Sequence, residues 1–238
     1  MMLRRRAWTI GLAVLPAALV WRAGWLDFLF GHPGEVLRLF GQHLVLVASS
    51  GAMAIALGLG LGIAVSRPRL RPLAAPVLAL AGLGQTVPSL ALLALLFALI
   101  GRIGFLPAFL ALTLTALLPV VRNTCLGLLT LDPAMLDAGR GMGMRGRQIL
   151  WRLELPNALG VIFAGIRTAL VVDVSAAALA FLIGAGGLGD LIFTGIDTQN
   201  TPILVAGVLP TTALALALDA ALARMQRRLA PGGSPRIG

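Results

Sequence analysis

This chain of 238 residues contains neither lysine nor tyrosine, and it has a single cysteine. ATP-binding loops of the Walker A type use a lysine to contact the phosphates, so the chain is not expected to bind ATP through such a loop. The single cysteine, Cys125, lies in an apolar stretch and has no disulfide partner in the chain. It is interpreted as a small packed hydrophobic residue.

Groups suited to catalysis or metal binding are also scarce. Only 12% of the residues are charged, compared with about 25% in a typical soluble domain. The two histidines, His32 and His43, are isolated and are expected at the outer membrane interface. The sequence shows no cluster of metal ligands and no convincing Ser-His-Asp or Cys-His set. We therefore expect a protein that is not an enzyme and holds no cofactor.

Long apolar runs dominate the chain, which is 58% hydrophobic with a mean hydropathy of +0.95. Because about 20 apolar residues are needed to cross the hydrocarbon core, the sequence predicts an all-α polytopic membrane protein. The first run is interpreted as a retained helix, since no cleavage site clearly follows it. Six transmembrane segments are predicted, at 7–25, 43–65, 73–100, 105–128, 157–184 and 202–223.

The distribution of the 19 arginines sets the orientation. With the N-terminus inside, 15 of them fall on the cytoplasmic side, and the outer loop at 185–201 carries two aspartates and no basic residue. By the positive-inside rule, both termini are predicted to be cytoplasmic. Since the arginines lie between apolar segments, they indicate contact with a lipid bilayer and argue against a nucleic-acid partner.

The third segment is interrupted by the sequence Gly-Leu-Gly-Gln-Thr-Val-Pro-Ser at 82–89. Such a break is tolerated in a membrane only where protein or a watery cavity satisfies the freed backbone groups, so it is expected to face inward. The alternative is that its polar side chains merely cap the backbone. The candidates for lining a translocation path here are Gln85, Thr86, Pro88 and Ser89.

Asp173 is a further candidate for the path, because an ionisable group in the middle of a span is costly and often functional. Arg167 lies about 240° away around the helix, so a pair within the helix is not expected. Asp173 is predicted to line the path, to pair with another helix or to stay protonated.

Small residues recur every fourth position in the second segment, at Ser50, Ala54, Gly58 and Gly62. Such a stripe lets helix backbones approach closely in a membrane, although an Ala- and Gly-rich composition could also produce it by chance.

The longest polar interruption, 131–156, is cytoplasmic by the charge argument. Asp132 and Pro133 form a strong helix start, and Gly141 and Gly143 are expected to end that helix. A second short helical piece is expected before Pro156 opens the fifth segment. The interruption therefore predicts a docking surface for a soluble partner.

This interruption resembles the EAA loop of ABC importer permeases, which has the pattern Glu-Ala-Ala, three residues, Gly, nine residues and Ile-x-Leu-Pro. The resemblance implies that the loop docks on a separate ATP-binding subunit. Three positions depart from the pattern, with Asp for Glu, Gly for the second Ala and Leu for Ile. A generic amphipathic helix at the interface is the alternative. The matching residues are Asp137, Ala138, Gly139, Gly143, Leu153, Leu155 and Pro156.

Three further stretches, 84–93, 165–169 and 183–189, are similar to osmoprotectant permeases of this class, which transport glycine betaine, choline or carnitine. The resemblance implies the type I, MetI-like importer fold, with a second permease copy or paralogue, two ATP-binding subunits and an extracytoplasmic solute-binding protein. It divides the chain into a first helix and outer loop (1–42), a permease domain (43–225) containing the loop at 131–156, and a tail (226–238).

Three alternatives remain from the sequence. The glycine run after the fifth segment also occurs in methionine-type importers, so a permease for methionine or another amino acid fits. An ion-coupled secondary transporter fits the broken helix, although inverted repeats are not evident. A membrane-embedded enzyme is disfavoured by the shortage of paired polar side chains.

Overall fold

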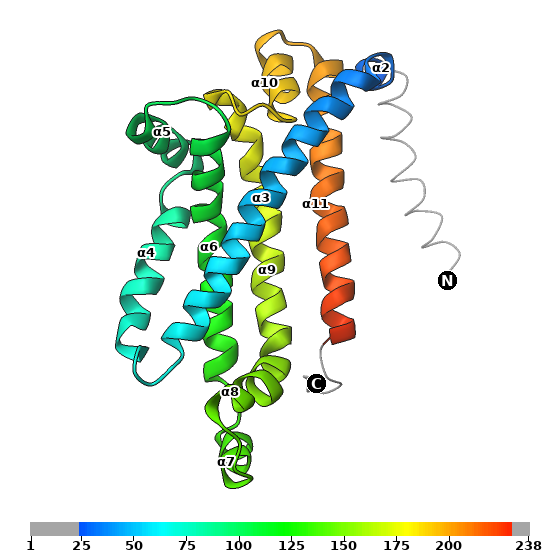
Figure 1. Ribbon diagram of the computed structural model, residues 1–238. Helices are drawn as coiled ribbons and strands as arrows, with labels where there is room; N and C mark the ends of the chain where they lie inside the picture. Colours follow the sequence, from blue (N-terminus) through cyan, green and yellow to red (C-terminus); the bar gives the residue numbers. More distant parts are fainter. Residues whose placement is uncertain (1–23, 230–238) are drawn as a thin grey trace, which may run out of the picture.

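The computed structural model describes residues 24–229, and every regular element in that range is helical. The predicted all-α class is confirmed. The elements, shown in Figure 1, are α2 (Asp27–Gly31), α3 (Pro33–Val65), the 3₁₀ turn η1 (Arg71–Leu73), α4 (Ala74–Thr86), α5 (Ser89–Ile100), α6 (Phe105–Leu129), α7 (Pro133–Gly141), α8 (Gly146–Ile149), the π-helical turn η2 (Leu150–Glu154), α9 (Leu155–Ala177), the 3₁₀ turn η3 (Ala178–Ile183), α10 (Gly189–Asp197) and α11 (Thr201–Leu229).

Four helical runs are long and apolar enough to cross a membrane: Pro33–Val65, Phe105–Leu129, Gly146–Ile183 and Thr201–Arg228. A fifth span arises when α4 and α5, which are bent by 102° relative to each other, are taken as one broken span. These runs correspond to the predicted segments between 43 and 223, and the predicted break in the third segment is present. The first predicted segment, 7–25, lies almost wholly outside the described residues.

Helix α3 is longer than predicted. It begins at Pro33, so residues 33–42, which the sequence places in an outer loop, form its first turns. Proline suits the first turn of a helix because its missing N–H is not needed there. These turns escape a search for apolar runs because Glu35, Arg38 and Gln42 interrupt them, yet Val36 and Leu39 pack with Leu188 and Leu191. In Figure 1, α3 crosses the bundle as a long diagonal.

The outer loop at 185–201 is also largely helical, which corrects its description as a loop. Helix α10 occupies Gly189–Asp197 and packs against α11. A Cβ at Gly195 would collide with the backbone of Leu204, and one at Gly189 would collide with the carbonyl of Ala178. The glycines in this region therefore allow close packing, a role that a glycine-rich sequence does not distinguish from a flexible turn.

The second short helical piece of the 131–156 interruption is not separate from the fifth segment. A single helical run extends from Gly146 to Ile183. Pro156 lies in the first turn of α9, immediately after the π-helical turn η2. A π-helical turn shifts the backbone hydrogen-bond ladder by one residue, so the chain can pass the proline without ending the helix.

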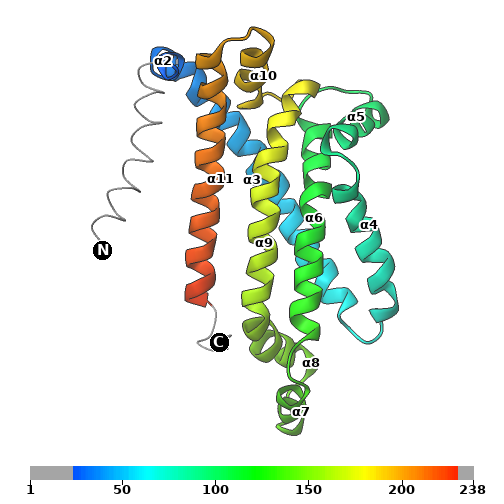
Figure 2. The ribbon, with the colours of Figure 1, turned by 180° about the vertical axis from the view of Figure 1, so that it is seen from behind.

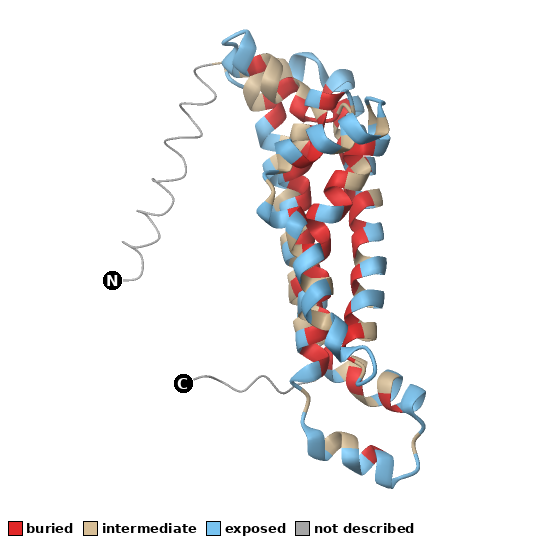
Figure 3. Cartoon of the chain, turned by 90° about the vertical axis from the view of Figure 1, so that its left-hand side faces the viewer, coloured by how far each residue is buried: buried red, intermediate tan, exposed pale blue. Residues whose placement is uncertain are grey.

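Helix α6 forms the centre of the bundle, with α3, α4, α5 and α9 packed around it (Figure 2). Figure 3 shows the buried residues concentrated along the inward faces of these helices. The predicted small-residue stripe of α3 lies at this centre, and its four members are all buried. A Cβ at Gly58 would lie 2.6 Å from Cβ of Val120, and a Cβ at Gly62 would lie 2.5 Å from Cβ of Thr124. The stripe therefore sets the close approach of α3 to α6.

We predict that Gly62→Ala lowers the free energy of unfolding by about 1–3 kcal/mol, because the added methyl group overpacks the contact with α6. Gly60→Ala is the matched control on the same helix, since no described atom lies within 4 Å of its Cβ position. That variant should be neutral or stabilising by up to about 1 kcal/mol through helix propensity. Thermal unfolding in detergent measures both, and equal melting temperatures would contradict the proposed packing.

Candidate functional site

The predicted start of the first loop helix is present in the structure. Asp132 is the N-cap of α7, and its Oδ1 accepts a hydrogen bond of 2.9 Å from the backbone N–H of Ala134. Pro133 occupies the first turn. Both features satisfy the helix terminus locally, so the sequence alone was sufficient to place it.

Helix α7 folds back onto η2 through Gly139, which is buried. A Cβ at this position would lie 2.6 Å from Cδ1 of Leu153 and 3.5 Å from Sδ of Met144. The glycine that replaces the second alanine of the EAA pattern thus lets α7 lie close to Leu153. The loop is a packed unit in which α7 lies directly against η2.

Gly143 closes α7 with a Schellman motif. Its φ is +77°, and its N–H donates to the carbonyl of Arg140 over 2.9 Å. The N–H of Met144 donates to the carbonyl of Gly139 over 3.1 Å. This pair of hydrogen bonds satisfies carbonyls at the helix end and requires a left-handed residue at position 143. The glycine of the pattern is therefore needed for its backbone conformation.

The matching residues of the loop divide into two groups. Asp137, Ala138 and Gly143 are exposed, and Asp137 forms a 2.6 Å ion pair with Arg140 within α7. The other members are Gly139, which is buried, and Leu153, Leu155 and Pro156, which are half-buried. The first group is available to a partner, and the second attaches the loop to the bundle. In Figure 3, α7 extends beyond the end of the bundle.

The residues of the α4–α5 break lie together at the end of α4 and the start of α5. Gln85, Thr86 and Pro88 are exposed, and Ser89 is half-buried. The Thr86 hydroxyl donates to the carbonyl of Gly82 over 3.2 Å, which is the local capping role considered as an alternative. Because the hydroxyl of Thr86 is engaged in this hydrogen bond, the exposed amide of Gln85 is the more accessible of the two polar groups.

Asp173 lies apart from this break, at the contact between α9 and α3. Its side chain is fully buried, and its Oδ2 accepts a 2.6 Å hydrogen bond from the hydroxyl of Ser50. Arg167 instead forms an ion pair with Asp219 of α11, with Nη2 and Oδ2 2.7 Å apart. The expectation that Arg167 does not pair with Asp173 is confirmed, and Asp173 is bonded to another helix.

His43 corrects the expectation of an interfacial histidine. The side chain is fully buried, and its Nε2 donates to the carbonyl of Val174 over 3.2 Å. It lies directly against Gly187, where an added Cβ would be 3.3 Å from Nδ1. The Oε1 of the neighbouring Gln42 accepts a 3.2 Å hydrogen bond from the N–H of Gly187. Because α3 starts earlier than predicted, His43 lies inside the bundle. His32, in contrast, is exposed.

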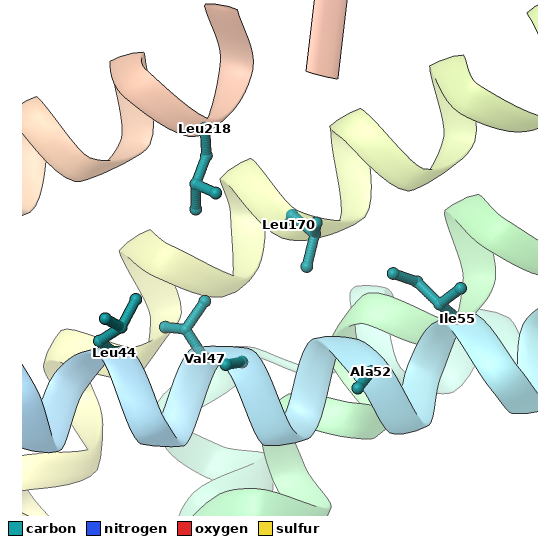
Figure 4. A pocket seen from close by; sticks show the side chains of 7 residues that line it. Leu44, Val47, Ala52, Ile55, Leu170 and Leu218 are labelled. Carbon is teal, nitrogen blue, oxygen red and sulfur yellow. The ribbon is translucent and has the colours of Figure 1, made fainter. Parts of the chain in front are cut away.

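An apolar groove of about 260 Å³ lies between α3, α9 and α11 (Figure 4). The side chains around it are aliphatic, so it offers no charged group to a polar solute. The lining residues are Leu44, Val47, Ala48, Ala52, Ile55, Leu170 and Leu218.

Comparison with known proteins identifies the protein family to which this helical chain belongs. The family described as the binding-protein-dependent transport system inner membrane component matches residues 54–232. The chain belongs to this family of permeases. The permease is therefore an inner-membrane transport subunit, as the sequence predicted.

Several permeases are similar over most of the chain. The osmoprotectant import permease protein OsmY of Salmonella typhimurium is 42% identical over 223 residues, which cover 94% of each chain. OsmW of the same organism is 45% identical and covers 87% of this chain and 98% of its own. The choline transport system permease protein OpuBD of Bacillus subtilis is 43% identical over 71% of this chain and 74% of its own.

Solved structures confirm the MetI-like fold. The MetNI methionine ABC transporter in an inward-facing conformation has a chain that matches with a TM-score of 0.71 at 24% identity, over 82% of this permease and 95% of that chain. A chain of an amino acid ABC transporter with histidines matches with a TM-score of 0.70 at 16% identity, over 85% and 98%. These likenesses establish the fold.

The structure adds residues to the loop surface of the permease that sequence reasoning missed. Met142 and Trp151 have exposed fractions of 74% and 62%. Large exposed apolar side chains such as these are enriched where a partner covers them. Trp151 borders a basic hollow of about 310 Å³ with Arg145, Arg147, Gln148 and Arg152. The signal available in the sequence was a large apolar residue between arginines.

We predict that Gly143→Ala loosens the docking loop without unfolding the permease. A left-handed alanine costs about 1–2 kcal/mol, so local opening should become roughly 5–30 times more frequent. Trypsin cleavage between 140 and 147 should accelerate accordingly, and Gly143→Asn should have a smaller effect because Asn tolerates this conformation.

Gly141→Ala is the matched control, because the ideal Cβ at Gly141 meets no described atom within 4 Å and its φ is not positive. Equal cleavage rates for Gly143→Ala and Gly141→Ala would contradict the Schellman motif.

Proposed function

We propose that the chain is the permease subunit of an ATP-driven importer for compatible solutes such as glycine betaine, choline or carnitine. The observation that carries this proposal is the 42–45% identity, over most of the chain, to permeases that are named for osmoprotectants and choline. The family membership argues against an ion-coupled transporter. The fold is shared with methionine and amino acid transporters, so it does not decide the solute.

Energy would enter through the docking loop. In our proposal a separate ATP-binding subunit binds the exposed surface of α7, and a second permease copy or a paralogue completes the pore. This assignment is supported by the Schellman closure at Gly143 and the close packing at Gly139, which together present α7 as a rigid projection.

The two ends of the bundle differ in charge, which supports cytoplasmic termini and a solute-binding protein on the other side. The end that carries α2 and α10 holds four acidic residues, Asp27, Glu35, Asp190 and Asp197, and two arginines, Arg38 and Arg102. The end that carries α7 holds the arginines of the α3–α4 turn, of α8 and η2, and of the last turns of α11: Arg67, Arg69, Arg71, Arg147, Arg152, Arg224, Arg227 and Arg228. Arginine-rich ends face the cytoplasm.

Recognition of a quaternary ammonium group is assigned to the solute-binding protein. Such groups bind in aromatic cages through cation–π attraction, and Tyr and Trp are the preferred walls. The chain has no tyrosine and four tryptophans, of which Trp8, Trp21 and Trp25 lie in or near the first predicted segment and Trp151 lies in the 131–156 loop. The permease would therefore pass the solute through a path of low affinity.

We assign that path to the α4–α5 break, with Gln85, Thr86, Pro88 and Ser89 as lining residues. The exposed amide of Gln85 and the 102° bend support this assignment. Asp173 remains a second, separate candidate for the path, although its carboxylate is hydrogen-bonded to Ser50 in this conformation.

Uptake into proteoliposomes tests the proposed solute class. The permease is reconstituted with its own ATP-binding subunit and solute-binding protein, and ATP is enclosed. We expect ATP-dependent uptake of at least one of glycine betaine, choline and carnitine, and none of methionine or histidine. Uptake of an amino acid without any quaternary ammonium solute would overturn the proposal.

We predict that Pro88→Ala slows uptake at least about tenfold in an assembled complex, because restoring the backbone hydrogen bond favours a more regular helix over the bend. ATP hydrolysis should lose its dependence on the loaded binding protein. Pro76→Ala is the control, since Pro76 is exposed in the first turn of α4. Normal uptake and normal stimulation in the Pro88→Ala complex would remove the break from the mechanism.

A further inference from the structure

The cytoplasmic end of α3 is joined to the docking loop by an ion pair. Nη2 of Arg67 lies 2.7 Å from Oε2 of Glu154, the last residue of η2. Glu154 is buried, with an exposed fraction of 8%, and within residues 24–229 it forms an ion pair with Arg67 alone. A buried carboxylate without a partner is costly, so the pair fixes the relative position of the two segments.

Arg67 is held in place by the last turn of α3. Its Nε donates to the carbonyl of Ile63 over 3.3 Å, and its Nη2 donates to the hydroxyl of Ser66 over 2.9 Å. The Ser66 hydroxyl in turn donates to the carbonyl of Ile63 over 2.7 Å. The guanidinium of Arg67 is therefore fixed to the last turn of α3, and a displacement of Glu154 would act on α3 through it.

Glu154 is equally tied to the docking loop. It follows Leu153, whose side chain lies against Gly139 of α7, and it precedes α9 without a break in the helical run. A displacement of α7 by a partner would therefore reach Glu154 through packed atoms, and α9 through continuous backbone.

The same two helices are hydrogen-bonded at a second level, through the adjacent residues Asp173 and Val174 of α9. Ser50 of α3 bonds Asp173 in the middle of the bundle, and His43 of α3 bonds the carbonyl of Val174. Above them, Gln42 and His43 hold the outer glycine segment at Gly187. Together with Arg67–Glu154, these bonds form a polar ladder between α3 and α9.

We propose that this polar ladder is the coupling strut of the permease, which makes α3 and α9 move as one body and carries motion between the docking loop and the outer segment at Gly187. Arg67 and Glu154 are its positioning pair. The inference rests on the proposed function only in that an ATP-binding subunit acts on the docking loop; it does not depend on which solute is carried.

Low-dielectric surroundings support this role, because a hydrogen bond to a buried carboxylate resists separation more strongly than one in water. Helix pairs joined only by aliphatic contacts can slide past each other, whereas a pair joined by polar contacts at two well-separated levels, Glu154 and Asp173–Val174, resists both sliding and rotation. Coupling between two sites is reciprocal, so binding of the solute-binding protein at the outer segment would influence the ATP-binding subunit through the same contacts.

The test measures the factor by which the loaded binding protein stimulates ATP hydrolysis in the reconstituted complex. Glu154→Gln and Arg67→Gln should each lower this factor about fivefold or more, whereas basal hydrolysis remains. The charge-reversed double variant Arg67→Glu/Glu154→Arg should recover a large part of the factor, which would show that the ion pair and not either residue alone is required.

Arg167→Gln is the matched control, because it removes an ion pair between α9 and α11 that is not part of the polar ladder. Arg167→Gln should leave the stimulation factor unchanged and should lower at most the melting temperature. If Glu154→Gln fails to assemble, Ser50→Ala decides, since it removes the middle hydrogen bond and leaves the Arg67–Glu154 ion pair in place. Wild-type stimulation in an assembled Glu154→Gln or Ser50→Ala complex would overturn the proposal. Failure of the wild-type complex to take up a compatible solute would instead refute the solute assignment alone.

Discussion

The approach of α3 to α6 depends on residues that have little or no side chain. In a bilayer, lipid tails compete equally for apolar side chains, so helices associate through close packing and through polar bonds that have no alternative partner. Gly58 and Gly62 bring the α3 backbone against Val120 and Thr124, and this position in turn places Ser50 opposite Asp173 and Arg67 beside Glu154. The polar contacts of α3 with Asp173 and Glu154 therefore depend on the close approach that these two glycines allow.

Features with a local cause were predictable from the sequence. The Asp132–Pro133 start and the break before Pro88 each follow from backbone chemistry within a few residues, and both occur in the structure. The stripe on α3 was predictable because its period of four matches one helix face. The exposed helix α7 was predictable in outline, since its start at Asp132 and its closing glycine both follow from the local sequence.

Features that depend on distant neighbours were not predictable. His43 was placed at the interface because nothing in its local sequence shows that Val174 and Gly187 enclose it. The glycines around α10 resemble a flexible loop until their contacts with Ala178 and Leu204 are known. Glu154 occupies an unspecified position of the EAA pattern, so its bond to Arg67 could be found only from the fold.

The length of α3 determines how the end of the bundle that carries α10 meets the aqueous phase. Its 33 residues extend about 50 Å at 1.5 Å per residue, whereas the hydrocarbon core is about 30 Å thick. Tilts of transmembrane helices rarely exceed about 40°, so tilt alone cannot hide this excess. The first turns of α3, with Glu35, Arg38 and Gln42 exposed, therefore stand above the bilayer as a helical shelf beside α10. A thicker membrane would submerge part of this shelf, and a thinner one would lengthen it.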